Sequence, residues 1–337
     1  MIKKLDLLSR RRFLTQLGGL ALAQSLPGCD RWDNKPLTIA AHVWPGYEPM
    51  FLAREKKWLD STKVHLIDTT SATDSLQALI DGKVDGAALT LDEMLKARAE
   101  NLPLSMVMIF NISAGADMLV ARPGIKELAD LKGKRVGFEQ GAVGELVLAE
   151  ILRITGLSKD DFKWVLRTID KHRETWNNHE VDAIITYEPV ASQLLADEGI
   201  NLFDSRQIPN MIVDVLAIRT DLLTRHYANA IQHLIFNHFR ALDHLNHNPL
   251  DAAYRISKRL DLPAEKVLSA FKGLVLPDAA NNYRLLAGTS PEFLSNARKL
   301  SNIMVNSHLL KQNDSLTALI RADYLPTEFA KMRYEKT

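Results

Sequence analysis

Short apolar, β-prone runs alternate with amphipathic stretches along the chain, and the alternation occurs twice. The first strand-like runs, between residues 37 and 110, are LTIAA, VHLID, GAALT and LSMVMIF, and helix-like segments begin near Pro49, Thr73, Leu91 and Ile125. The second runs, between residues 134 and 204, are KRVGFEQ, KWVLRT, DAIIT and INLFD, with helices from Ala142, Lys171 and Pro189. This alternation predicts parallel α/β sheet. After IVDVLAI, residues 212–218, the chain is expected to be nearly all helical.

The two halves share a weak internal similarity. Residues 82–95, GKVDGAALTLDEML, and residues 179–191, HEVDAIITYEPVA, both place Val-Asp before a small apolar strand. In both, a Thr ends the strand and an acid begins the next helix. Two similar lobes would explain the similarity, and so would two unrelated βα units.

Residues 1–28 are predicted to be a signal peptide. Basic residues at positions 3, 4 and 10–12 precede FLTQLGGLALAQSL, which is too short and too weakly hydrophobic to span a bilayer stably. The stretch SRRRFL resembles a twin-arginine export signal with Arg10 and Arg11 as its pair, although ordinary secretory signals also carry such arginines. This segment takes no part in the predicted fold.

The apolar stretch ends in LPGC, which resembles the lipobox of bacterial lipoproteins and implies lipidation of Cys29. The polar sequence DRWDNKP follows this only cysteine, which argues against a buried thiol. Residues 29–36 would then be a lipidated linker. Asp30 resembles the signal that retains lipoproteins at the inner membrane, so the expected location is its periplasmic side, with the lipid as anchor.

Composition and charge are those of a globular protein with a large core. Hydrophobic residues make up 46% of the chain and charged residues 25%, and about 300 residues after the signal are enough for two lobes. Without the signal, the 42 basic and 41 acidic residues become 37 and 40, a net charge of −3. Nucleic acid is not expected as a partner, because binding its phosphates requires a basic surface.

Polar and aromatic residues gather after the predicted strands, where open α/β sheets bind their ligands. VWPGYEP follows the first strand, and a second Tyr-Glu-Pro follows a strand of the other half. The predicted ligand-binding residues are His42, Trp44, Tyr47, Glu48, Ser71, Thr73, Thr90, Asp92, Ser113, Asp117, Gln140, Gly141, Tyr187, Glu188 and Asp214.

Structural roles are the alternatives at these positions. The Ser, Thr and Asp residues after the strands are good helix caps that need no ligand. Glu48 and Glu188 each precede a proline and take a predicted cap position that Glu rarely occupies, which favours binding, but a carboxylate that complements a helix dipole also fits. Trp44 and Tyr47 are either buried structural aromatics or a wall against which a ligand stacks.

Five segments carry a family resemblance through their order and spacing. They are LTIAAHVWPGYEPMFLAREKKWL, SATDSLQALIDGKVDGAALTLDEML, SAGADMLVA, LADLKGKRVGFEQGAVGELVL and TYEPVASQLL. Together they resemble the solute-binding proteins of ABC importers for nitrate, sulfonates, taurine and thiamine precursors, over most of residues 37–219. The resemblance implies an α/β, two-lobed type II periplasmic binding protein fold. Its lobes would be residues 37–115 with 220–337, and 123–213, and its hinge crossovers 114–123 and 213–219.

The resemblance also implies the function. A small molecule would be captured between the lobes, with one Tyr-Glu-Pro on each, and delivered to an ABC permease and ATPase, or the protein would serve a membrane sensor. No enzymatic activity, cofactor or metal ligand is expected. A related branch makes the thiamine pyrimidine with pyridoxal phosphate and a cysteine-rich motif, whereas this chain has only Cys29. A cleft with two carboxylates as acid and base would be the enzymatic alternative.

Charge indicates the class of ligand. No Lys or Arg occurs in the turns predicted to form the site, whereas Glu48, Asp92, Asp117, Glu188 and Asp214 lie in or near them. Buried carboxylates without partners are costly, so the pocket should favour a cation, an amine or ring N–H donors. An amine-bearing or aminopyrimidine-like molecule is expected. A sulfonate zwitterion such as taurine also fits, and nitrate fits poorly.

Overall fold

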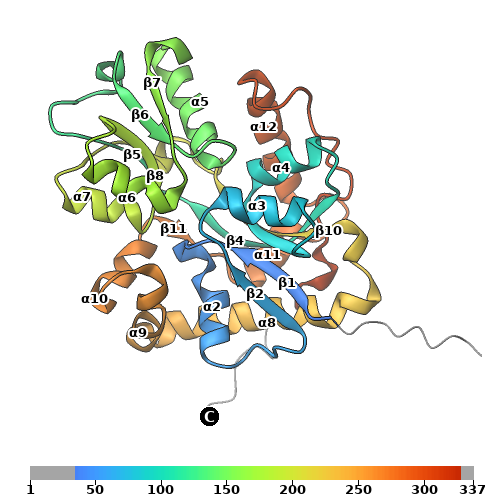
Figure 1. Ribbon diagram of the computed structural model, residues 1–337. Coiled ribbons are helices and arrows are strands. Elements are labelled where there is room, and N and C mark those ends of the chain that lie inside the picture. The colour runs from blue at the N-terminus through green and yellow to red at the C-terminus, as the bar shows by residue number, and fades with distance from the viewer. Residues whose placement is uncertain (1–34, 328–337) are drawn as a thin grey trace, which may run out of the picture. The chain divides into compact units, whose positions relative to one another are not determined.

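Two mixed β-sheets organise the computed structural model, which describes residues 35–327 (Figure 1). The first sheet has the order β2-β1-β3-β10-β4-β11, and the second has the order β7-β6-β8-β5-β9. In the first sheet β10 runs antiparallel to both neighbours, and in the second β5 does so. The strands are β1 Leu37–Ala41, β2 Val64–Asp68, β3 Gly86–Thr90, β4 Leu104–Ser113, β5 Asp117–Ala121, β6 Arg135–Phe138, β7 Lys163–Leu166, β8 Ala183–Tyr187, β9 Ile200–Asp204, β10 Val213–Arg219 and β11 Leu274–Val275.

Helices pack against each sheet (Figure 1). Helices α5, α6 and α7 contact the second sheet, whereas α3, α4 and α8 contact the first. The helices are α2 Glu48–Glu55, α3 Ala72–Ile80, α4 Leu91–Ala99, α5 Val143–Thr155, α6 Ile169–Asn177, α7 Val190–Ala196, α8 Arg225–His247, α9 Pro249–Leu260, α10 Ala264–Val267, α11 Ala279–Leu286 and α12 Glu292–Asn306. The expected helical C-terminal region is thus present, and it packs on the first lobe, with α8 against α2 and α12 against α4.

The two sheets have the same topology. Strands β2, β1 and β3 correspond in position to β7, β6 and β8, and each set is followed by its antiparallel strand. The similar segments 82–95 and 179–191 therefore contain equivalent units, β3 with α4 and β8 with α7. This is the arrangement that two similar lobes predict.

Two connections cross between the sheets. Residues 114–116 lead from β4 to β5, and residues 205–212 lead from β9 to β10. The crossings are joined, because the hydroxyl oxygens of Ser113 and Ser205 lie 2.8 Å apart and the N–H of Gly115 donates to the Ser205 hydroxyl at 2.6 Å. Gly115 has φ +123°, a conformation open to glycine without a steric penalty.

The crossings are shorter than the sequence predicts. Residues 213–219 were expected to cross between the lobes but form β10, because their backbone pairs with β3 and β4 on its two sides. Residues 117–121 form β5 for the same reason, between β8 and β9. The helix expected near Ile125 is reduced to a 3-10 turn at Leu128–Leu131, after a Pro-Gly pair in which Gly124 has φ +101°.

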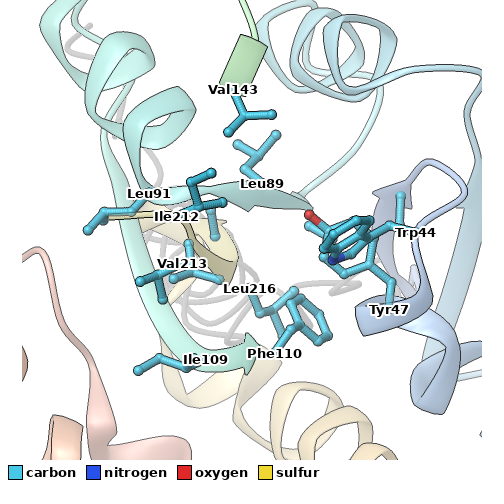
Figure 2. Packing of buried hydrophobic residues seen from close by; sticks show 14 of the residues in the cluster. Trp44, Tyr47, Leu89, Leu91, Ile109, Phe110, Val143, Ile212, Val213 and Leu216 are labelled. Carbon is cyan, nitrogen blue, oxygen red and sulfur yellow. The ribbon is translucent and has the colours of Figure 1, made fainter. Parts of the chain in front are cut away.

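One cluster of buried apolar side chains extends from the first sheet to the second. Figure 2 shows part of it, with Trp44 and Tyr47 near Phe110, and Val143 of α5 above Leu89 of β3. Residues 36–327 belong to one compact unit. None of the helices between residues 35 and 327 is long and apolar enough to cross a membrane. The predicted signal peptide, with Arg10 and Arg11, and Cys29 lie outside the described residues.

Candidate ligand-binding site

A small cavity lies at the strand ends where the two lobes meet. Its volume is about 10 Å³, close to the space that one water molecule needs. Both lobes contribute to it, and each of its lining residues is buried. The lining residues are His42, Trp44, Ala72, Thr90, Glu93, Asp117, Val143, Tyr187 and Asp214.

Sheet topology places an acid in the cavity from each lobe. Asp214 lies opposite Thr90 in the register of β10 and β3, and Asp117 lies opposite Tyr187 in the register of β5 and β8. An antiparallel strand begins where its parallel neighbours end. The first residues of β5 and β10 therefore join the carboxyl ends of the parallel strands, where α/β sheets bind ligands.

A hydrogen-bond network fixes Asp214. The hydroxyl of Tyr47 donates to Oδ1 of Asp214 at 2.5 Å, and Nδ2 of Asn111 donates to Oδ2 at 2.7 Å. Oδ1 of Asn111 accepts from the indole Nε1 of Trp44 at 2.9 Å. Gly46 makes room for this bond, because a Cβ at that position would lie 1.7 Å from Oδ1 of Asn111. The network holds Trp44 and Asp214 in place before any ligand arrives.

Aromatic rings from both lobes meet at the cavity. The ring of Tyr187 lies edge-to-face with Trp44, at 5.4 Å between centroids, and 5.6 Å from the ring of His42. His42 in turn lies edge-to-face with Tyr47 at 5.4 Å. The aromatic residues thus form a wall that is both structural and exposed to the cavity.

Four lining residues have a buried polar atom that finds no hydrogen-bond partner within residues 35–327. These atoms are Nδ1 of His42, Oγ1 of Thr90, Oδ2 of Asp117 and the hydroxyl of Tyr187. Buried polar groups in folded proteins are nearly always hydrogen-bonded, and leaving one unpaired costs about 1–3 kcal/mol. These atoms therefore remain available to a ligand with several hydrogen-bonding groups.

The cavity is rich in carboxyl groups. Burial raises the pKa of Asp117 to about 7 and that of Asp214 to about 8, and neighbouring carboxylates add to both effects. Burial, with the nearby Asp92, also raises the pKa of Glu93 well above its usual range. Among the described lining residues none is Lys or Arg. A positive charge in the cavity would stabilise the ionised forms of these acids.

Six of the predicted residues line the cavity, namely His42, Trp44, Thr90, Asp117, Tyr187 and Asp214. Tyr47 lies behind them as the support of Asp214. Six others lie outside the lining. Ser71 caps α3, Thr73 contacts Glu139, Asp92 is buried in the first turn of α4, Ser113 bonds Ser205, Gln140 is exposed, and Gly141 is half-buried beside Lys96.

Glu48 is not at the cavity, contrary to the sequence prediction. Nη1 of Arg259, on α9, donates to Oε1 of Glu48, and Nε donates to Asp68 at 2.8 Å. Nη2 of Arg259 also donates to the carbonyl of His42 at 3.0 Å. Glu48 is fully buried, so its charge serves an ion pair between α2 and the C-terminal helices.

Glu188 does not line the cavity either. Its carboxylate accepts from the hydroxyl of Ser192 at 2.7 Å and from the Ser192 N–H at 3.1 Å, in the first turn of α7. Neither glutamate takes the expected cap position, because the N-cap residues are Tyr47 for α2 and Pro189 for α7. The Glu188 carboxylate accepts from the first turn of its helix, whereas the Glu48 carboxylate is paired with Arg259.

Three lining residues were missed. Glu93 could have been found, since Thr90-x-x-Glu93 is the pattern of a capping box, and its Oε2 does accept from the Thr90 N–H at 2.9 Å. Ala72 and Val143 carry no chemistry that a sequence pattern could reveal. Across residues 35–327, no group of three or more His, Cys, Asp or Glu is placed to hold a metal ion.

Solved structures share this fold. The alkanesulfonate-binding protein SsuA of Xanthomonas axonopodis pv. citri, bound to MOPS, matches with a TM-score of 0.68 at 18% identity, over 86% of this chain and 97% of its own. The aliphatic sulphonate binding protein SsuA of Escherichia coli matches with a TM-score of 0.66 at 19% identity, over 85% and 97%. The two-lobed periplasmic binding protein fold that the sequence predicts is thereby confirmed.

Sequence comparison gives the family. A 4-amino-5-hydroxymethyl-2-methylpyrimidine phosphate synthase of Aspergillus parasiticus is 26% identical over 125 residues, 36% of each chain. The chain spans 36% to 56% of the length of the first curated relatives that it matches. The family model described as NMT1/THI5 like matches residues 44–233. This range begins in the turn after β1, runs through both sheets and ends within α8. The chain belongs to the NMT1/THI5-like family.

Proposed function

We propose that this protein is the solute-binding component of an ABC importer, and that its solute is a small molecule with several N–H donors, an amine or an aminopyrimidine. One observation carries the choice of solute. Glu93, Asp117 and Asp214 line a buried cavity in which none of the described lining residues is Lys or Arg. An N–H donor would satisfy Oδ2 of Asp117, which has no partner within the described chain, and a positive charge would offset the cost of burying the three carboxylates.

The remaining lining suits a small planar molecule. Trp44 and Tyr187 come from opposite lobes and offer aromatic surface, while Thr90 and Tyr187 offer hydroxyl groups without partners. The name of the Aspergillus relative contains a 4-amino-pyrimidine, which has ring nitrogens and an amino group. That chemistry agrees with the lining, although the relative is matched over only 36% of its length.

A sulfonate or nitrate ligand is less compatible with the cavity. Both are anions, and they would lie among three carboxyl groups. An anion would be bound only if these groups were protonated, which costs affinity as the pH rises. The ligands of the sulfonate-binding structures therefore do not transfer to this chain, whose identity to them is 18% and 19%.

A melting-temperature panel tests the solute class. Amines, aminopyrimidines, taurine, alkanesulfonates and nitrate would be added to the mature protein at pH 6 and pH 8. We expect stabilisation by amines or aminopyrimidines, since a ligand at 100 times its dissociation constant adds about 2.7 kcal/mol to the free energy of unfolding. Asp117→Asn and Asp214→Asn should abolish the response, and Glu174→Gln on the exposed face of α6 should keep it. Stabilisation by the anions alone would refute the proposed class.

A positively charged solute should also release protons on binding. The pKa values of Asp117 and Asp214 are raised to about 7 and about 8, so both carboxyls are partly protonated near neutral pH. A cation favours their ionised forms, and its affinity should therefore rise between pH 6 and pH 8. Calorimetry in buffers of different ionisation enthalpy measures the number of protons released. Uptake of protons would contradict a cationic solute.

Catalysis is the second candidate, because two relatives are named as synthases of an aminopyrimidine phosphate. Such a synthase forms the pyrimidine, whereas a binding protein only binds its solute. Mass spectrometry of the pyrimidine-free protein after incubation with pyridoxal phosphate, which the resemblance implies for the synthase branch, distinguishes the two. A newly formed pyrimidine phosphate supports enzymatic activity, and its absence together with ligand binding in the melting-temperature panel supports transport.

The proposed route to the periplasm rests on the first 36 residues. Cys29 would be lipidated and anchor the protein to the periplasmic face of the inner membrane, where an ABC permease with its ATPase, or a membrane sensor, is the partner. Cys29→Ser should release the protein from the membrane fraction and remove the acyl mass. Lys at both Arg10 and Arg11 should block export by the twin-arginine route, and unchanged export would indicate the general secretory route.

A further inference from the structure

Glu139 connects the two lobes beside the cavity. It follows β6 in the second lobe, and its side chain is 2% exposed. Oε1 of Glu139 accepts from the N–H of Thr73 at 3.0 Å and from the Thr73 hydroxyl at 2.6 Å. Oε2 accepts from the N–H of Ile169 at 3.2 Å. Both oxygens act as acceptors, as expected of a carboxylate.

The partners of Glu139 are the starts of two helices from opposite lobes. Thr73 lies in the first turn of α3, and Ile169 is the first residue of α6. Helix N-termini present free N–H groups and a partial positive charge, and so they bind anions. Ala72, directly before Thr73, lines the cavity. The carboxylate of Glu139 thus occupies an anion position at the edge of the proposed solute site.

Glu93 makes the reciprocal contact. It comes from the first lobe, and its Oε1 accepts from the N–H of Val143 at 3.2 Å, at the start of α5 in the second lobe. Each lobe therefore places a glutamate on a helix N-terminus of the other. Lys96 adds an ion pair across the same boundary, with its Nζ 2.9 Å from Oε2 of Glu145.

We propose that Glu139 determines the specificity for solutes. Its carboxylate fills the position between the N-termini of α3 and α6 where the acidic group of a solute would bind. It thereby excludes anionic solutes. This inference rests on the proposed function only in taking the solute to bind between the lobes. The sulfonate or carboxylate of a solute would have to displace the Glu139 carboxylate, which is covalently part of the chain and already accepts three hydrogen bonds. A neutral or cationic solute meets no such competition.

Removal of the side chain tests the proposal directly. In Glu139→Ala the donors of Thr73 and Ile169 lose their acceptor, and a small anion should take its place. Melting temperature and calorimetry would be followed with acetate, nitrate and methanesulfonate, and with acetamide as the neutral analogue of acetate at the same ionic strength. We expect Glu139→Ala to bind acetate about tenfold or more tightly than acetamide, because hydrogen bonds to a charged acceptor are the stronger ones.

Three proteins serve as controls. The wild type should bind none of the three anions, and Glu139→Gln should behave like it, because the amide still fills the position. Glu150→Ala removes another buried glutamate, 2% exposed, which lies inside α5 rather than at a helix start and accepts from Arg153 of the same helix. It should gain no anion binding. If Glu139→Ala fails to fold, refolding in acetate against acetamide replaces the titration, and recovery in acetate alone is the expected result.

Three outcomes overturn the proposal: equal anion binding by the wild type, equal gain by Glu150→Ala, or no preference of Glu139→Ala for acetate over acetamide. The panel with amines and aminopyrimidines is independent of this result. If that panel fails while Glu139→Ala gains anions, the proposed solute is wrong and the role of Glu139 stands. If the panel succeeds and Glu139→Ala gains nothing, the solute stands and Glu139 is only a contact between the lobes.

Discussion

The chain contains Tyr-Glu-Pro twice, at residues 47–49 and 187–189, and the two copies differ in their hydrogen bonds and ion pairs, although both tyrosine rings lie beside His42. The first follows β1 and the second follows β8, which corresponds to β3 rather than β1 in the matching topology. The hydroxyl of Tyr47 is bonded to Asp214, whereas that of Tyr187 has no partner within the described chain. Glu48 pairs with Arg259, and Glu188 with Ser192.

The difference shows that the tripeptide itself does not define a role. The copy at residues 47–49 is structural, since it ties α2 to the C-terminal helices and fixes an acid of the cavity. The copy at residues 187–189 presents its tyrosine to the cavity. The surrounding residues decide between these roles, and substitutions in and around the two copies should therefore differ in the size of their effect or in the property that they change.

The largest expected difference concerns the two glutamates. Arg259→Met should lower the free energy of unfolding by about 3–5 kcal/mol, because it leaves Glu48 buried without its cationic partner. Glu188→Gln should cost at most about 1.5 kcal/mol, since it weakens two hydrogen bonds within one helix start. Urea unfolding measures both. Arg284→Met, which removes an exposed ion pair with Glu292, is the control, with a change within about 1 kcal/mol. Equal losses of unfolding free energy in Arg259→Met and Glu188→Gln would contradict the predicted difference between the two copies.

The two tyrosines give the next largest effect. Tyr47→Phe should cost about 1.5–3 kcal/mol of stability, because Asp214 loses a donor inside the core. Tyr187→Phe should leave stability within about 0.5 kcal/mol, since its hydroxyl has no partner in residues 35–327. It should instead weaken solute binding about tenfold, the equivalent of one hydrogen bond. The reverse pattern, with a stability loss at Tyr187, would show that the copies are alike.

Stability should fall as the pH rises from 6.5 to 8. Asp214, beside Tyr47, and Asp117, opposite Tyr187, have pKa values raised by burial to about 8 and about 7. In the unfolded chain an aspartate has a pKa of about 4, so between about pH 4 and its folded pKa each of the two carboxyls is protonated in the folded state but not in the unfolded state. The stabilisation that this proton gives is lost as the pH rises through that range. Asp214 should account for about 1–2 kcal/mol of the loss above pH 6.5.

Histidines act in the opposite direction at lower pH. Burial, with the charge of Arg259 as a smaller cause, lowers the pKa of His42 to about 3, and burial lowers that of His238 to about 3. Their contribution is lost as the pH falls below about 6.5. Between about pH 4.5 and 6 the gain from the two histidines offsets the loss from the two aspartates, so thermal melts in matched ionic strength should change little there and decline above about pH 6.5. Asp214→Asn should flatten the decline more than Asp117→Asn, and an unchanged decline in both variants would contradict the assignment.

The smallest expected effect lies in one histidine near each copy. His238 packs on Phe110, which packs on Tyr47, and both of its ring nitrogens lack partners in the described chain. His238→Leu should therefore raise stability by about 1 kcal/mol.

His172 is the histidine near the second copy. Its ring nitrogens bond the hydroxyl of Thr186, next to Tyr187, at 3.1 Å and the carbonyl of Arg167 at 3.0 Å. His172→Leu should lower stability by about 1–3 kcal/mol. Chemical denaturation of both variants decides, and a loss in His238→Leu would point to a hydrogen bond for that side chain.

Local sequence patterns predict much of the fold. The β-prone runs of β1, β2, β3 and β4 and the helices that follow the first three of them are located correctly, because burial and periodicity are local properties, whereas the helix expected near Ile125 is only a 3-10 turn. The two antiparallel strands were harder to place. DMLVA in β5 and VDVLAIR in β10 look like any apolar run, and only their partners in the sheets distinguish a strand from a crossover. The pairing register of two distant segments cannot be read from a short stretch of sequence.

Part of the candidate cavity's lining follows from topology alone. His42, Thr90 and Tyr187 follow or end strands, and a strand end in an α/β sheet is a known location for ligands. Arg259 was not predictable, because it pairs with a residue 211 positions away through the packing of α9 on α2. Its presence changes the role of Glu48. Charge balance around a buried acid depends on the whole molecule, so a count of charges in nearby turns is a poor guide to it.

The cavity of about 10 Å³ sets a kinetic condition. If the proposed solute binds there, a pyrimidine or an amine is larger than this space, so its exchange would require the lobes to separate. The rate of uptake would then be limited by the frequency of opening, even at high solute concentration. Release would depend on the same motion, and a membrane partner that holds the lobes apart would control unloading without contacting the solute.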